Sequence, residues 1–172
     1  MLPGRRMAEL SARERLQPSL LDRLTDDETD KRDEPREKRV LGMRGLRRAV
    51  LRDLGWLFNA TGIGSLQDLE DYPLVARSVL NFGFADLSGH TASGLDAAAV
   101  ARRLRQAIWD FEPRIMRDSV QVLVTAGAGN QLVFEVHGQL WGQPLPERLY
   151  LKTELDLELG EIRVYDEDAR SA

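Results

Sequence analysis

The sequence contains no cysteine, so neither a disulfide framework nor a thiolate metal site can form. Its two histidines, His90 and His137, are not at metal-ligand spacing, and a lone histidine is more often an ordinary residue than a ligand. No stretch approaches the ~20 apolar residues of a membrane span. The N-terminus has arginines but no apolar run of signal-peptide length after them. We therefore expect a cytoplasmic protein without metal, cofactor or direct membrane insertion.

The sequence also lacks a surplus of basic charge. Its 24 Lys+Arg stand against 28 Asp+Glu, which gives a formal charge of −4. Dedicated nucleic-acid-binding proteins usually carry a clear basic surplus, so we expect no nucleic-acid partner. Hydrophobic residues make up 42% and charged residues 30% of the chain, which suits one soluble globular domain with a tail.

Motifs of known catalytic or nucleotide-binding sites are missing as well. No Gly-x-Gly-x-x-Gly follows an expected strand, and there is no phosphate-binding lysine loop and no Gly-x-Ser-x-Gly elbow. Two carboxylates, Asp110 and Glu112, lie beside aromatic residues, where a raised pKa would suit the general acid of a glycosidase. The simpler interpretation is that Glu112 and Arg114 flank Pro113 at a helix-to-strand corner and form an ion pair. We expect no catalytic residue.

The chain divides into three parts by composition. Residues 1–39 form a charged extension, residues 40–166 the folded domain, and residues 167–172 an acidic tail. Residues 26–39 contain only two uncharged residues, so they predict a mobile linker. Before the linker, a short helix either is a solvated spacer or docks onto a partner. Its candidate docking residues are leucines: Leu16, Leu20, Leu21 and Leu24.

The domain begins with a helix expected over residues 43–60. Five apolar residues recur at helical spacing: Leu46, Val50, Leu54, Leu57 and Phe58. Its flank carries a cationic stripe of four arginines: Arg44, Arg47, Arg48 and Arg52. The stripe is either a solvated face or a contact with an acidic partner surface, and Arg44, Arg48 and Arg52 are the candidate partner-binding residues.

Three further helical segments are expected before residue 113. A weak capping box at Ser65 and Asp68 predicts one turn, and Pro73 predicts the start of a short helix with Val75, Val79 and Phe82 facing inward. Ser93 with Asp96 repeats the capping pattern before a long helix. The buried stripe of the long helix is Val100, Leu104, Ala107, Ile108 and Phe111, and Pro113 ends it.

After Pro113 the hydrophobic period changes from that of a helix to that of strands. Alternation predicts strands around 120–125, 132–137 and 149–159, and a two-residue turn at Gly160 leads to a fourth strand. Leu149, Leu151, Leu155, Leu157 and Leu159 are expected on one face of the third strand. Helices followed by strands linked through hairpins predict an α+β fold with N-terminal helices packed on a small, mainly antiparallel C-terminal sheet.

Four stretches together resemble the TssE family, relatives of the baseplate wedge protein of contractile-tailed phages. They are RDLGWLFN at 52–59, SVLNFGFADLSG at 78–89, FEPR at 111–114 and LYLKTELDLE at 149–158. The segment RLQPSLLDRLTDD near the N-terminus is also similar to the opening of that family, and the likeness covers about residues 13–165.

The resemblance implies a structural subunit of a type VI secretion system that links the baseplate wedge to the contractile sheath and promotes sheath assembly. The implied partners are the baseplate subunits TssF, TssG and TssK, the VgrG spike hub and the TssB/TssC sheath, at the cytoplasmic face of the inner membrane. The family's Glu-Pro-Arg motif matches Glu112, Pro113 and Arg114, and the resemblance implies that these residues are central to the role.

Two other functions are alternatives. One is a regulatory binding module of the anti-adaptor type, which has the same fold. The other is a peptidoglycan hydrolase, since the phage relatives were once labelled lysozyme-like. The charged extension and its leucines favour the baseplate subunit over the regulator, and the hydrolase lacks an export signal and a second placed carboxylate. A shared fold does not by itself indicate the baseplate, regulatory or hydrolase function.

Overall fold

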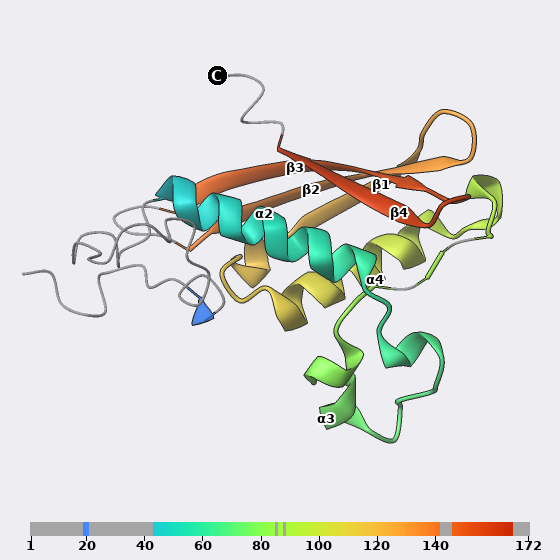
Figure 1. The fold of residues 1–172 in the computed structure, drawn as a ribbon, viewed down its shortest axis with the longest axis horizontal. Coiled ribbons are helices and arrows are strands. Elements are labelled where there is room, and N and C mark those ends of the chain that lie inside the picture. Colours follow the sequence, from blue (N-terminus) through green and yellow to red (C-terminus); the bar gives the residue numbers. More distant parts are fainter. Residues whose placement is uncertain (1–18, 21–42, 85, 88, 142–145, 167–172) are drawn as a thin grey trace, which may run out of the picture.

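The computed structural model describes residues 19–20, 43–84, 86–87, 89–141 and 146–166. Leu16, Leu21 and Leu24, the expected linker and the acidic tail at 167–172 lie outside the described residues. The domain has two long helices and a four-stranded sheet, with helices first and strands last along the chain (Figure 1). The expected α+β fold is therefore confirmed.

The two long helices, α2 (Met43–Asn59) and α4 (Ala97–Phe111), lie on one face of the sheet (Figure 1). Each buries its apolar stripe as the spacing predicted, except that Phe111 at the end of α4 is only partly buried. Helix α2 contacts β4 (Glu161–Asp166), and α4 contacts β1 (Gln121–Ala126). The buried residues of the helices are Leu46, Ala49, Val50, Leu54, Leu57 and Phe58 on α2 and Val100, Leu104, Ala107 and Ile108 on α4.

The sheet is antiparallel throughout, in the order β1-β2-β3-β4, with β2 at Gln131–Leu140 and β3 at Glu147–Asp156. Alternate residues of β2 and β3 face the helices and are buried. They include Leu132, Phe134, Val136, Leu149, Leu151, Thr153 and Leu155. Polar residues such as Glu135, Lys152 and Glu154 occupy the alternate positions, so the opposite face of the sheet is polar, as the alternation predicted.

Two local predictions were wrong: which residue caps α4, and how long the turn between β3 and β4 is. Asp96 itself caps α4, because its Oδ1 accepts from the backbone N–H of Ala98 at 2.9 Å and of Ala99 at 3.1 Å; Ser93 lies in the short η4 turn (Ala92–Gly94). The β3–β4 connection is longer than two residues, since Asp156 pairs with Glu161 across it. Its first residues are held by the Asp156 carboxylate, an Asx-type turn, and Leu159 is exposed rather than in the core.

Residues 62–82 leave the two-layer body after α2 and return before α4, and we call this segment the lobe (Figure 1). It contains three short turns of helix: η2 (Ile63–Ser65), α3 (Pro73–Ala76) and η3 (Val79–Asn81). The single short helix predicted over residues 73–82 is therefore broken, and the turn predicted to start at Ser65 ends there instead. Phe82 packs edge-on against Phe111 as an inward residue, but Val79 is 83% exposed, contrary to the prediction.

Candidate functional site

The chain turns sharply between α4 and the sheet at Glu112–Arg114. Glu112 makes the last helical hydrogen bond, from its N–H to the Ile108 carbonyl at 2.9 Å, and Pro113 then has no N–H to continue the helix. Ile115 is buried and bridges to Leu140, and the N–H of Trp141 donates to the Arg114 carbonyl at 2.8 Å. The corner is thus held against the end of β2.

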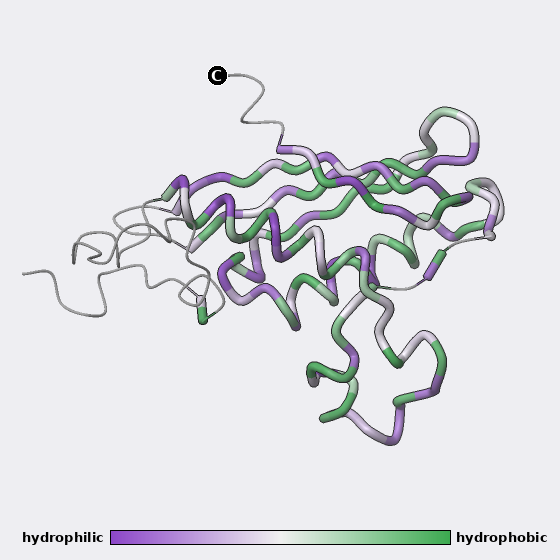
Figure 2. The backbone as a smooth tube through the Cα atoms, viewed as in Figure 1, coloured by the Kyte–Doolittle hydropathy of each residue, from purple (hydrophilic) through white to green (hydrophobic). Residues whose placement is uncertain are grey.

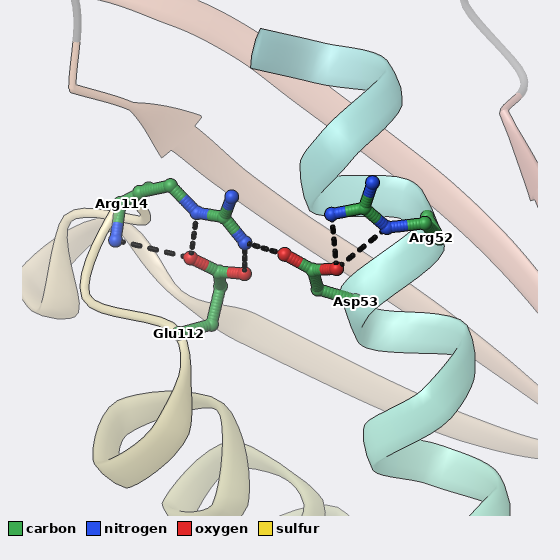
Figure 3. Close-up of polar contacts among 4 residues, drawn as sticks. All are labelled: Arg52, Asp53, Glu112 and Arg114. Atoms are coloured by element: carbon green, nitrogen blue, oxygen red, sulfur yellow. Dashed lines mark hydrogen bonds and ion pairs between the residues drawn. The ribbon is translucent and has the colours of Figure 1, made fainter. Parts of the chain in front are cut away.

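Four charged side chains form a chain of ion pairs across this corner (Figure 3). Arg114 donates from Nε to Glu112 Oε1 at 2.6 Å and from Nη2 to Glu112 Oε2. Its Nη2 also donates to Asp53 Oδ2 on α2 at 2.6 Å. Arg52 completes the series, because its Nε donates to Asp53 Oδ1 at 2.9 Å. The ion pair predicted between Glu112 and Arg114 is therefore present, and it extends to a second helix.

Burial makes this arrangement structurally important. Glu112 is only 2% exposed, and a buried carboxylate is costly unless it is paired. Burial lowers the pKa of Arg114, but hydrogen bonds and charge attraction from Glu112 and then Asp53 outweigh it and raise that pKa above its usual value. A raised folded-state pKa contributes stability below the unfolded-state pKa, and that stability is lost only as the pH rises through the higher folded value. Arg114 is therefore charged at physiological pH.

Two half-exposed tryptophans flank the charged corner. Trp56 is 51% exposed, and the Arg52 guanidinium lies over its ring at 5.0 Å. Trp141 is 50% exposed and adjoins Arg114 through its backbone hydrogen bond. Pro113 is also exposed. Tryptophan and arginine are the residue types that most often carry binding energy at protein interfaces.

The cationic stripe predicted on α2 is divided by the structure. Arg44 and Arg48 are exposed and make no ion pair with other described residues, so they match the predicted solvent-facing stripe. Arg47 instead points to the end of the sheet, where it binds Asp166 at 2.6 Å and Glu147 at 3.1 Å. Arg52 turns to Asp53 and Trp56. Of the four docking leucines only Leu20 is described, and it is 70% exposed.

Sequence reasoning missed Asp53 and Asn59. Asp53 was detectable as the sole acidic residue of a helix with four arginines, but its partner 61 residues away was not. Asn59 donates from Nδ2 to the Ile162 carbonyl and accepts at Oδ1 from the Ile162 N–H, both at 2.8 Å. Its amide therefore occupies both backbone groups of one residue on the outer edge of β4.

The arrangement of the carboxylates does not suit a glycosidase. Both oxygens of Glu112 accept from Arg114, and Asp110 accepts from Gln106 at 2.8 Å. Asp53, the carboxylate linked to Glu112, is separated from it by the Arg114 guanidinium instead of by a space for a sugar and water. Within the described ranges, no group of three metal-ligating side chains gathers, and no helix is long and apolar enough to cross a bilayer.

Exposed tryptophans beside an arginine are features of surfaces that bind other proteins. In the comparison with protein families, the family described as baseplate wedge protein gp25 matches residues 44–145. The chain belongs to this baseplate wedge family, which is structural rather than catalytic and has a phage-like baseplate role among other baseplate components. Comparison with curated proteins and with solved structures gives no match.

Proposed function

We propose that this chain is the TssE-type baseplate subunit of a type VI secretion system, and that it links the baseplate wedge to the contractile sheath. Membership of the baseplate wedge family supports the baseplate part of the proposal. The observation that supports the proposal most is that the buried Glu112 pairs with Arg114, which also bonds to Asp53, so that ion pairs hold the Glu-Pro-Arg corner against α2. The partners are TssF, TssG, TssK, the VgrG hub and the TssB/TssC sheath.

Within the corner we assign different roles to buried and exposed groups. Glu112 acts by holding the fold, since its 2% exposure leaves no surface for a partner. Pro113, Trp56 and Trp141 supply the contact surface, because they are exposed around the ion pairs. Tryptophan and arginine are among the residue types most enriched in interface hot spots.

The β3–β4 hairpin is the second contact that we propose, through addition of a sheath strand. Strand β4 is at the edge of the sheet, where backbone groups are open to a further strand. Asn59 already occupies Ile162, so a sheath strand has to pair beyond that point, around Val164. Since outward-facing backbone groups alternate along a strand, Val164 faces the same way as Ile162.

The first experiment is co-purification of the tagged chain from its native cell. We expect wild type to recover TssF, TssG and sheath subunits. Trp56→Ala with Trp141→Ala should recover less at a temperature where circular dichroism shows that this variant is still folded. Glu112→Gln, which removes the buried negative charge that pairs with Arg114, should reduce recovery and melting temperature together. If wild type recovers no baseplate or sheath subunit, the proposed function is wrong.

The strand contact has its own test. Val164→Pro removes an outward N–H without removing a hydrogen bond to β3, and Val164→Ala controls for the lost side chain. We expect Val164→Pro to prevent sheath assembly while wedge subunits still co-purify. Normal sheath assembly with Val164→Pro would exclude strand addition at this position.

A further inference from the structure

The lobe exposes more large hydrophobic side chains than any other described segment of comparable length. Five large apolar side chains are exposed within residues 66–80: Leu66 at 82%, Tyr72 at 61%, Leu74 at 86%, Val79 at 83% and Leu80 at 65%. None of its three helical turns contains a buried residue. Hydrophobic stretches of the chain therefore extend well away from the core (Figure 2). Gathered exposed apolar side chains mark an interaction site more often than isolated ones do.

The lobe is held in shape although it has no core of its own. The Asn81 side chain donates to the Ala76 carbonyl and accepts from the Gly64 N–H, both at 2.8 Å. At its base, Phe84 donates to the Ala60 carbonyl at 2.7 Å. A Cβ at Gly62 would lie 2.7 Å from the Asn81 carbonyl oxygen, so only glycine permits this close approach. A segment fixed in this way presents its apolar side chains in a defined arrangement, which lowers the entropy cost of binding.

An open groove of about 690 Å³ runs between the lobe and α4. Its apolar lining includes Leu69, Phe84, Ala107 and Phe111. Its charged lining consists of Glu70, Asp86 and Asp110 against Arg77 and Arg103, and the lobe adds Asp68 and Asp71. The groove and lobe together thus carry five carboxylates and two guanidinium groups, a net negative charge.

These features indicate which kind of partner segment could bind in the groove. An extended strand needs open backbone groups to pair with, whereas α4 uses its backbone within the helix and the lobe uses much of its own in turns. A helix satisfies its own backbone and needs only side-chain contacts. The acidic border favours lysine or arginine on that helix, and it disfavours a second copy of this lobe because like charges would meet.

We propose that the lobe and its groove bind an amphipathic helix of another subunit of the assembly, with apolar residues on one face and basic residues at its border. The proposal rests on the proposed function only in that the partner belongs to the same machine. It adds a contact surface separate from the Glu112–Arg114 corner and from the edge of β4. Leu74, Val79 and Leu80 would supply the apolar contacts, and Glu70 and Asp71 the charge.

The test starts in the native cell with a photo-crosslinking residue, p-benzoylphenylalanine, at position 79. The same residue at position 123 is the matched control, since Leu123 is also exposed but lies on β1, far along the chain from the lobe and from the β3–β4 hairpin. We expect position 79, and not position 123, to crosslink to one segment of one protein, with helical spacing of apolar residues and an excess of lysine and arginine. No crosslink at position 79, or a crosslink to an acidic or extended segment, would overturn the proposal.

A synthetic peptide of the crosslinked segment then binds the purified chain in a direct affinity measurement. Leu74→Ser with Val79→Ser should weaken binding at least tenfold, and Glu70→Lys with Asp71→Lys should also weaken it and reduce its salt dependence. All four side chains are exposed, so the melting temperature should not change. Affinity equal to wild type in both variants would overturn the proposal.

The outcomes separate this inference from the proposed function. If lobe variants recover wedge and sheath subunits as wild type does, the lobe inference is wrong and the baseplate function stands. If wild type recovers no baseplate subunit, the proposed function is wrong. In that case the position-79 crosslink and the peptide affinities still test whether the lobe binds a helix. A crosslinked segment that belongs to no baseplate or sheath protein would show that the partner is not part of this machine.

Discussion

Arg114 and Asp53 lie 61 residues apart in the chain, and their side chains meet at 2.6 Å between Nη2 and Oδ2. Through this bond the corner after α4 is joined to the middle of α2. The same guanidinium binds both oxygens of the buried Glu112. One side chain therefore neutralises a buried charge and fixes how two elements of the domain sit beside each other.

Replacing Arg114 should be strongly destabilising. In Arg114→Ala the Glu112 carboxylate stays buried without its partner, so we expect a loss of about 3–5 kcal/mol in the free energy of unfolding. Urea unfolding of the purified chain measures it. The control is Arg48→Ala, an exposed arginine whose removal should change stability by no more than about 0.5 kcal/mol. Equal effects of the two substitutions would show that the ion pairs do not hold the corner.

Asn59 should protect the edge of β4. Its amide makes two hydrogen bonds to Ile162 and one to the Gly55 carbonyl, and Asn59→Ala removes all three. We expect a loss of about 1–3 kcal/mol and faster hydrogen exchange in the peptide that contains Ile162.

Asn59→Asp is the matched variant for that experiment. It keeps an acceptor for the Ile162 N–H but loses both donated bonds, so the Ile162 amide should stay protected while stability still falls. Unchanged exchange at Ile162 in Asn59→Ala would contradict the proposed role of Asn59.

The layers of this fold were predictable because local patterns determine them. The apolar spacing on α2 and α4 and the missing N–H of Pro113 define the helices, and the alternation around Leu149 and Leu151 defines a half-buried strand. The exposed lobe was not predictable in this way, because the rule assumes that apolar residues at helical spacing are buried. Val79 follows that spacing and is 83% exposed.

The candidate site was predictable only in part. Glu112 and Arg114 are two residues apart, so an ion pair between them could be expected from the sequence. The contribution of Asp53 depends on how α2 and α4 pack, which a local pattern does not encode. Arg47 pairs with acidic residues, whereas its neighbour Arg48 is exposed, and the sequence could not predict this difference for the same reason. It depends on where the end of the sheet lies relative to α2.

Gly83 should tolerate no side chain. Its φ is +139°, and a Cβ there would lie 2.3 Å from the Ala60 carbonyl oxygen. Gly129 also has a positive φ, +64°, but its Cβ would meet nothing within 4 Å. Gly129→Ala should therefore cost about 1–2 kcal/mol from backbone strain alone, and Gly83→Ala should cost clearly more in the same urea experiment. Equal costs would mean that the base of the lobe can move away from Ala60.

Neighbouring arginines on α2 should respond oppositely to charge reversal. Arg47 lies between Asp166 and Glu147, so Arg47→Glu places a third carboxylate there and should lower stability by about 3 kcal/mol or more. Arg44 and Arg48 are exposed, so Arg44→Glu with Arg48→Glu should leave urea unfolding nearly unchanged. If these two arginines contact an acidic surface of a baseplate neighbour, the double reversal should still reduce recovery of wedge subunits, because like charges then meet at the contact. Full recovery with the double reversal would refute a partner role for Arg44 and Arg48 and leave them as a solvated helix face.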